Sequence, residues 1–481
     1  MTQPTISNAR ASASRQKGAA LLLMMLVVLV SITAILVSSI NNSEARIRKG
    51  VATRDSLAQA RQALLDFAAV QQDLVPGSPA QLPCPDIDDT GATIEGEAHT
   101  GACGAAGVSV IGRLPWRTLG VEALRDASSE CLWYAVSGSW KLATGNSAEL
   151  INPDSNGQLQ LWSLETSGLV VGTTPDSRPV AIVFAANAPL DGQRRAAPAA
   201  GEFCDPGFSA DDFLDADAGL GISNAVLSGS PDAVDAFAVA ERFMETHNDR
   251  AAFITRSDLE RAITGRYDFD ARMRALGLAV TRCVADYAQK NPGGANDRRL
   301  PWPAPLSMAD YRLSANYDDV DIGSLSGRLA NAVDTSNALT GNTTTDLLTG
   351  CDTVAVPEWN AETQRLWQNW KDHFFYAVAE SHAPAAGTPS TCGSCLTVNG
   401  SGQYAAVVIF GNSRLPAAAQ SRNAPPMDSD DRSDPSNYLE GGNAAFFPLP
   451  SGTADFSSQA TSNTFNDRLF CIDNALAVTE C

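Results

Sequence analysis

The feature that most constrains this chain of 481 residues is a nearly unbroken apolar run from Ala19 to Ile40. A helix rises about 1.5 Å per residue, so the run would extend roughly 33 Å, enough to cross a bilayer core of about 30 Å. A cleaved secretory signal has a shorter apolar region, about 7–15 residues long. The run therefore predicts a transmembrane helix over residues 19–40. Basic residues before it would stay in the cytoplasm, and the long region after it would be exported.

The junction in front of the run is also informative, because a short hydrophilic leader ends in Lys17-Gly18 and the apolar residues follow at once. This junction resembles the amino terminus of type IV prepilins and type II secretion pseudopilins. The resemblance implies that a prepilin peptidase cleaves between Gly18 and Ala19, discards the leader 1–18 and methylates the new amino terminus. The competing interpretation is an ordinary amino-terminal anchor in which the glycine has no role.

Two positions depart from the family pattern. The first mature residue is usually Phe or Met, but here it is Ala19, and the usual glutamate at the fifth mature position is replaced by Leu23. In the family, that carboxylate pairs with the terminal amine of a neighbouring subunit. Its replacement resembles the large K-type minor pseudopilin and the PilX-type minor pilins. The resemblance therefore implies a minor subunit near a filament tip.

Composition excludes some classes of function. The chain has 54 Asp and Glu against 34 Lys and Arg, a net charge of −20 that argues against nucleic-acid binding. Its ten cysteines are an even number, and behind an export segment they predict disulfides. The pairs that the spacing suggests are Cys84 with Cys103, Cys283 with Cys351, Cys392 with Cys395, Cys131 with Cys204, and Cys471 with Cys481, the last closing the carboxyl terminus as in many pilins. The connectivity stays open, since sequence alone cannot select one pairing.

Landmarks that recur in the same order indicate an internal repeat. The matching segments are 63–85 and 283–303, 113–136 and 355–378, 180–190 and 405–415, 211–215 and 436–440, and 247–255 and 465–473. We therefore expect an α+β fold with a helical stalk and first pilin-like module over 41–263 and a second related module over 264–481. Each module would place a helix on an antiparallel sheet.

Periodicity locates several elements. Apolar spacing predicts helices over 44–71, 273–290 and 363–381, and Ser257 to Glu260 fits a capping box in front of the second of these. Runs rich in β-branched residues predict buried strands at 178–186 and 403–412, and neighbouring strands at 159–165 and 168–174.

The search for chemistry finds little. The four histidines form no HExxH motif, and no GxSxG elbow, Walker loop or GxGxxG is present, so we expect no enzymatic activity. His247 is expected to be a packing residue, because the second copy has Phe465 there. The repeated Asn-Asp-Arg at 248–250 and 466–468 is interpreted as a turn whose arginine pairs with an internal acid.

One acidic loop is the best candidate for a metal site. Asp86, Asp88 and Asp89 offer hard oxygens that suit Ca²⁺, and some pseudopilins carry a structural calcium. The competing interpretation is a solvated acidic turn, which the lack of a glutamate at EF-hand spacing favours. No other cofactor is expected.

Taken together, the sequence predicts a non-enzymatic minor pilin or pseudopilin in the inner membrane, with its carboxyl-terminal region in the periplasm. Its partners would be other pilin or pseudopilin subunits, prepilin peptidase and the inner membrane. It would act in assembly or at the tip of a type IV pilus or type II secretion pseudopilus. The alternative is a periplasmic hydrolase or ligand-binding protein held by an uncleaved amino-terminal anchor.

Overall fold

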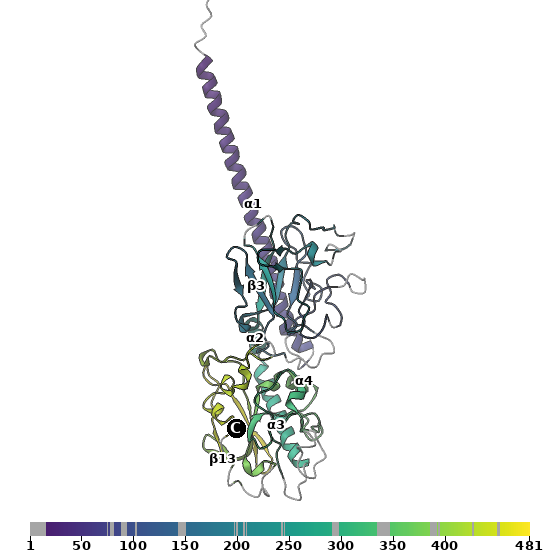
Figure 1. Ribbon diagram of the computed structural model, residues 1–481, viewed down its shortest axis with the longest axis vertical. Coiled ribbons are helices and arrows are strands. Elements are labelled where there is room, and N and C mark those ends of the chain that lie inside the picture. Colours follow the sequence, from purple (N-terminus) through teal and green to yellow (C-terminus); the bar gives the residue numbers. More distant parts are fainter. Residues whose placement is uncertain are drawn as a thin grey trace, which may run out of the picture. The chain divides into compact units, whose positions relative to one another are not determined.

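The computed structural model (Figure 1) divides into two compact units, Met1–Asp55 and Ser56–Cys481. The residues that it describes are 16–74, 76, 81–87, 94–101, 103–142, 151–196, 198, 201–204, 207, 209–241, 244, 246–290, 298–333, 347–384, 392, 395–425, 428–449 and 453–481.

The longest helix, α1, runs from Gln16 to Leu74 and belongs to both units. Within the first unit its large apolar side chains from Leu21 to Ile32 are exposed. Within the second unit Leu57, Leu64 and Ala68 are buried in the main hydrophobic core. These residues are seven and eleven apart, so they lie on one face of the helix, which packs into the compact body.

Within the second unit we call residues 56–263 the first half and residues 264–481 the second half. The first half is built on a four-stranded antiparallel sheet with the strand order β1-β2-β5-β9. Its strands are β1 (Val110–Arg113), β2 (Trp133–Val136), β5 (Pro179–Ala185) and β9 (Arg250–Thr255). Strand β5 is buried on both faces because alternate residues enter two cores: Val183 joins the core that contains α1, and Ile182 joins a separate core with Trp133.

The second half is built on a larger sheet in which β10, β11, β13 and β15 are neighbours in that order. Its strands are β10 (Ser326–Arg328), β11 (Phe374–Val378), β12 (Leu396–Val398), β13 (Ser401–Phe410), β14 (Asp455–Phe456), β15 (Arg468–Asp473) and β16 (Val478–Glu480). Helix α3 (Phe269–Lys290) packs against β13 and β15 of this sheet, as Figure 1 also shows.

Smaller elements complete the two halves. The remaining strands are β3 (Leu159–Ser163), β4 (Gly168–Val171), β6 (Ala216–Asp217), β7 (Ile222–Ser223) and β8 (Asp235–Val239), and the remaining α-helices are α2 (Arg256–Thr264) and α4 (Ala361–Trp370). The short 3-10 helices are Pro175–Ser177, Ala210–Asp212, Ser314–Tyr317, Lys371–His373, Glu380–His382, Pro416–Ala418, Asp431–Ser433, Pro435–Asn437 and Asn443–Phe446. The expected pairing of neighbouring strands at β3 and β4 is present.

The two halves repeat one another at the level of single contacts. Tyr134 on β2 faces Val183 on β5, and Tyr376 on β11 faces Val408 on β13. Each tyrosine hydroxyl donates a hydrogen bond of 3.2 Å to a proline carbonyl, that of Pro83 in the first half and that of Pro301 in the second. The domain boundary at residues 263 and 264 stays a prediction, because Ser56–Cys481 forms a single compact unit.

The expected fold class needs a correction. The α+β arrangement is present, but the transmembrane helix over 19–40 is contradicted: among the described residues, no helix combines the length and apolar character needed to cross a membrane. A long apolar run in the sequence was therefore insufficient evidence for a spanning segment.

Two local predictions also differ from the structure. The cap of α2 is the pair Thr255 and Asp258, in place of Ser257 and Glu260, and the helix begins at Arg256. The helix expected over 363–381 ends at Trp370, because residues 374–378 pair with β13 as strand β11. Periodicity could not distinguish helix from strand at residues 374–378, since β11 is buried on both faces and its apolar residues do not alternate with polar ones.

Candidate functional site

The amino-terminal part of α1 presents an apolar surface. Gly18 and Ala19 lie near the start of the helix, and Leu23 is 68% exposed. We define the N-terminal apolar surface as the side chains that share exposures of 52–72%: Leu21, Leu22, Leu23, Met24, Met25, Leu26, Val27, Val28, Leu29, Val30 and Ile32. Ser31 and Thr33 add no unsatisfied hydroxyl donor to this surface, because their hydroxyls donate to the Val27 and Leu29 carbonyls of the same helix. A contiguous exposed apolar surface of this kind marks a site of interaction.

Five disulfides are present, as the sequence predicts. They join Cys84 to Cys103, Cys131 to Cys204, Cys283 to Cys351, Cys392 to Cys395, and Cys471 to Cys481, and no cysteine is left free. Two of them close long segments of 73 and 68 residues. Cys392 and Cys395 form a local bridge in a loop before β12, which fits the structural interpretation of this CxxC pair.

Of the three residues of the calcium candidate, Asp86 alone lies among the described residues. Asp86 is buried, and its carboxylate accepts a hydrogen bond of 2.7 Å from the backbone N–H of Gly96. Asp88 and Asp89 lie outside the described residues. The calcium site therefore stays a prediction.

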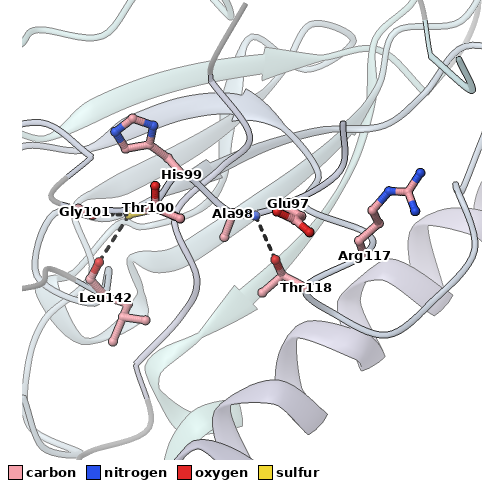
Figure 2. A pocket seen from close by; sticks show the side chains of 9 residues that line it. Glu97, Ala98, His99, Thr100, Gly101, Arg117, Thr118 and Leu142 are labelled. Atoms are coloured by element: carbon pink, nitrogen blue, oxygen red, sulfur yellow. Dashed lines mark hydrogen bonds between the residues drawn. The ribbon is translucent and has the colours of Figure 1, made fainter. Parts of the chain in front are cut away.

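A cavity of about 410 Å³ lies beside this loop (Figure 2). Its wall is formed by Cys84, residues 97–101, Arg117, Thr118 and Leu142. The Ala98 backbone N–H donates to the Thr118 hydroxyl at 2.8 Å, which holds the loop against the neighbouring segment. The Arg117 guanidinium stacks over the Trp116 ring at 4.3 Å. These contacts stabilise a disulfide-closed loop.

A large buried polar centre among the described residues joins the two halves. Asp154 is 1% exposed, and its carboxylate lies 2.9 Å from His373 Nε2, 3.0 Å from an Arg422 nitrogen and 3.3 Å from Arg414 Nε. The Asp154 backbone carbonyl accepts further bonds from Arg256 at 2.9 Å and Arg432 at 2.8 Å. We call these six residues the inter-half network. Asp154 and Arg256 come from the first half, and the other four come from the second.

Electrostatics in this network favour the ionised aspartate. Burial alone would raise the pKa of Asp154, but Arg422, the His373 ring and Arg414 together hold it well below its usual value. A buried carboxylate surrounded by cations is thus charged at neutral pH. Asp154 is therefore a structural anion between the halves.

A second polar centre occurs twice, once in each half. In the first half, Asp249 Oδ2 accepts hydrogen bonds of 2.8 Å from the Asp215 backbone N–H and from the Asn224 amide. Asp215 Oδ2 in turn accepts from the backbone N–H groups of Asn248 and Asp249. We call Asp215, Asn224, Asn248 and Asp249 the first-half cage.

The second half repeats this arrangement with Glu440, Asn443, Asn466 and Asp467, the second-half cage. Asp467 Oδ2 accepts at 2.9 Å from the Glu440 backbone N–H and from the Asn443 amide, and Glu440 accepts from the Asn466 backbone N–H. The amide nitrogens of Asn248 and Asn466 each donate at 2.7 Å to a carbonyl of their own half, Ala188 or Ser413.

One buried carboxyl group in each cage, that of Asp249 or Asp467, resists ionisation. Burial, and then the charge of Asp215, raise the pKa of Asp249 well above its usual value. Burial, and then the charge of Glu440, do the same to the pKa of Asp467. Like charges that share a dry site favour a bound proton or a cation.

The sequence repeat includes residues of both cages, but the sequence did not indicate that these residues lie together. Residues 211–215 and 247–255 each contributed a match to the repeat, yet they form one site only because the chain folds back over more than thirty residues. Arg468 pairs with an acid, Asp270 at 2.8 Å, but the Asp270 side chain is exposed and not internal as expected. Arg250 instead donates to the Glu241 backbone carbonyl. The inter-half network left no sequence signal, because its members are scattered from residue 154 to residue 432.

Comparison with known proteins adds no family: no protein-family model, no curated protein and no solved structure matches the chain. Its function is therefore argued from its own sequence and geometry.

Proposed function

We propose that this protein is a non-enzymatic minor pilin or pseudopilin that assembles with other subunits through its N-terminal apolar surface. The observation that carries the proposal is the contrast within α1. Its side chains from Leu21 to Ile32 are 52–72% exposed, whereas Leu57 and Leu64 of the same helix are 5% and 0% exposed. The helix is thus anchored at one end in a compact body and unpartnered at the other. Helices of neighbouring subunits are an occupant that would cover this surface.

The rest of the chain suits such a subunit. Each half places a helix against an antiparallel sheet, which is the arrangement that the pilin resemblance implies. Five disulfides are typical of proteins that mature in an oxidising compartment such as the periplasm. The buried acids and arginines described above are engaged in structural contacts, which supports a role in interaction in place of catalysis.

Leu23 supports a position at the end of a filament. A subunit with leucine at the fifth mature position cannot supply the carboxylate that neutralises the terminal amine of the subunit above it. Such a chain is tolerated where nothing lies above it, and we therefore infer a low-copy subunit at the tip. Quantitative mass spectrometry of sheared filaments should find it far below the major subunit in amount. Immunogold labelling along the whole filament would contradict the tip position.

Processing at Gly18 is the direct test of the pilin assignment. The intact mass of the protein extracted from cells that contain a prepilin peptidase should correspond to a chain that begins at a methylated Ala19. The Gly18→Ala variant should retain the 18-residue leader, because the peptidase requires glycine at the cleavage point. Gly50→Ala is the matched control: it lies in the same helix, and a methyl group there would meet no atom within 4 Å.

Two results would overturn the assignment. A wild-type chain that keeps Met1, or one cut beyond Ile40, would favour the hydrolase or ligand-binding alternative. Normal maturation of the Gly18→Ala variant would show that the glycine has no role in processing.

A further inference from the structure

The two cages differ at one position that changes their chemistry. His247, directly before Asn248, is 0% exposed in the first-half cage, and Phe465 stands in the same place before Asn466 in the second. Around this position most hydrogen bonds of one cage have a counterpart in the other, among them those that Asp249 Oδ2 and Asp467 Oδ2 accept. The second half shows that a hydrophobic side chain is sufficient for folding there. The histidine of the first half therefore needs a separate explanation.

The geometry brings His247 into the cage. One ring nitrogen of His247 and one carboxylate oxygen from each of Asp215 and Asp249 all lie within 4.8 Å of one another, and all three residues are buried. A hydrogen bond of 2.9 Å joins His247 Nε2 to the Ala238 backbone carbonyl. Since a carbonyl can only accept, Nε2 carries the proton and Nδ1 holds a lone pair in the neutral ring.

Three buried atoms at this cage have no hydrogen-bond partner: His247 Nδ1, Asn248 Oδ1 and Asp249 Oδ1. The second-half cage has the equivalents of the last two in Asn466 Oδ1 and Asp467 Oδ1, so the unpartnered imidazole nitrogen is what distinguishes the first half. A buried acceptor without a partner costs about 1–3 kcal/mol. A histidine ring oriented by a backbone carbonyl through its other nitrogen is also the usual arrangement of a metal-binding histidine. Both features are satisfied at once if a cation occupies the space between the three side chains.

We propose that Asp215, His247 and Asp249 bind a divalent transition-metal ion, with Zn²⁺ as the ion of choice. One imidazole nitrogen and two carboxylate oxygens form a ligand set that suits Zn²⁺ and disfavours Ca²⁺, which prefers oxygen alone. Ligand distances of about 2.0–2.2 Å place two ligand atoms at most about 4.4 Å apart, so atoms within 4.8 Å of one another need to approach by at most a few tenths of an ångström to meet this limit. The ion would tie the segment at Asp215 to the start of β9.

The second half supplies an internal comparison. Its cage retains the acid pair, Glu440 and Asp467, but Phe465 removes the nitrogen ligand. Two carboxyl groups alone are neutralised more simply by a shared proton. The chain thus has one copy built for a metal ion and one copy without it. This site is independent of the pilin assignment, since it rests on the cage residues alone.

The test is the zinc content of the untagged full-length chain, loaded with excess Zn²⁺, desalted and measured by native mass spectrometry. We expect one zinc per chain. His247→Phe places in the first half the residue that the second half already tolerates. It should weaken zinc binding by more than about 100-fold, since losing even a hydrogen-bond partner of a metal ligand costs about 10–100-fold. His382→Phe is the control for the other candidate group, where His382 lies beside the bonded Cys392 and Cys395.

Two further measurements test the site without counting bound zinc: the absorption spectrum of bound Co²⁺ and the shift in Tm. Co²⁺ in the site should give visible d–d bands without the thiolate charge-transfer band that cysteine ligands produce. Zn²⁺ should raise the Tm of the wild type and leave the Tm of a folded His247→Phe variant unchanged. A wild-type chain that binds no zinc, or zinc that survives His247→Phe but is lost in His382→Phe, would overturn the proposal.

Discussion

Replacing Asp154 with asparagine removes the only carboxylate that we place at the centre of the inter-half network. The substitution keeps the size and shape of the side chain. It leaves the Asp154 backbone carbonyl in place, so the hydrogen bonds from Arg256 and Arg432 survive. What is lost is the negative charge at 2.9 Å from His373, 3.0 Å from Arg422 and 3.3 Å from Arg414.

The magnitude follows from burial. Arg422 is 0% exposed and hydrogen-bonds otherwise to uncharged groups, the Asn437 and Asn412 backbone carbonyls and the Gln420 amide oxygen. Removing one partner of a buried ion pair typically costs about 3–5 kcal/mol, because the remaining charge is left uncompensated. Arg414 keeps Asp176 at 3.1 Å and needs less compensation. We therefore expect Asp154→Asn to lower the free energy of unfolding by about 3–5 kcal/mol.

Urea unfolding at pH 7, followed by tryptophan fluorescence, measures the loss. Asp191→Asn is the control, since Asp191 is exposed and its substitution should change stability by less than about 0.5 kcal/mol. The pKa of Asp154 lies well below its usual value in the folded chain. Its contribution is therefore present above the unfolded pKa near 3.8 and is lost as the pH falls through the folded value. An Asp154→Asn variant within 1 kcal/mol of the wild type at pH 7 would refute the reasoning.

Two further changes test the buried pairs and the packing of α3. The raised pKa of Asp467 gives stability that is complete below the unfolded pKa and is lost as the pH rises through the folded value. Asp467→Asn should therefore flatten the decline of unfolding free energy with pH above the unfolded pKa by up to about 1.4 kcal/mol per pH unit, and an unchanged slope would show that Asp467 is already ionised. Gly277→Ala should lower the Tm, because a Cβ at this position overlaps the Phe470 ring and overpacking costs about 1–3 kcal/mol. This cost exceeds the gain in helix propensity of about 1 kcal/mol. A raised Tm would show that Phe470 can move aside.

The sequence predicted local and repeated features well. β-branched runs located β5 and β13, and residue spacing suggested the same five cysteine pairs that the structure contains. It failed where tertiary contacts decide the outcome. Residues 374–378 have the spacing of a helix face, yet pairing with β13 makes them a strand. Hydropathy predicted a membrane span over 19–40, which the described part of α1 does not support.

Each half contains an arginine with equivalent hydrogen-bond partners, but the two arginines pair with different acids. Arg195 and Arg422 occupy equivalent places: the first donates to the Asp212 and Asn187 carbonyls and to Gln193, the second to the Asn437 and Asn412 carbonyls and to Gln420.

Their acidic partners differ. Arg195 lies 3.5 Å from Glu130 of its own half, whereas Arg422 lies 3.0 Å from Asp154 of the other half. A first half folded alone would keep the partner of its arginine. A second half folded alone would bury Arg422 without a counter-charge, which costs several kcal/mol. The second half therefore takes the counter-charge of Arg422 from the first half, in addition to the hydrophobic core and the Asn152 contacts that the two halves share.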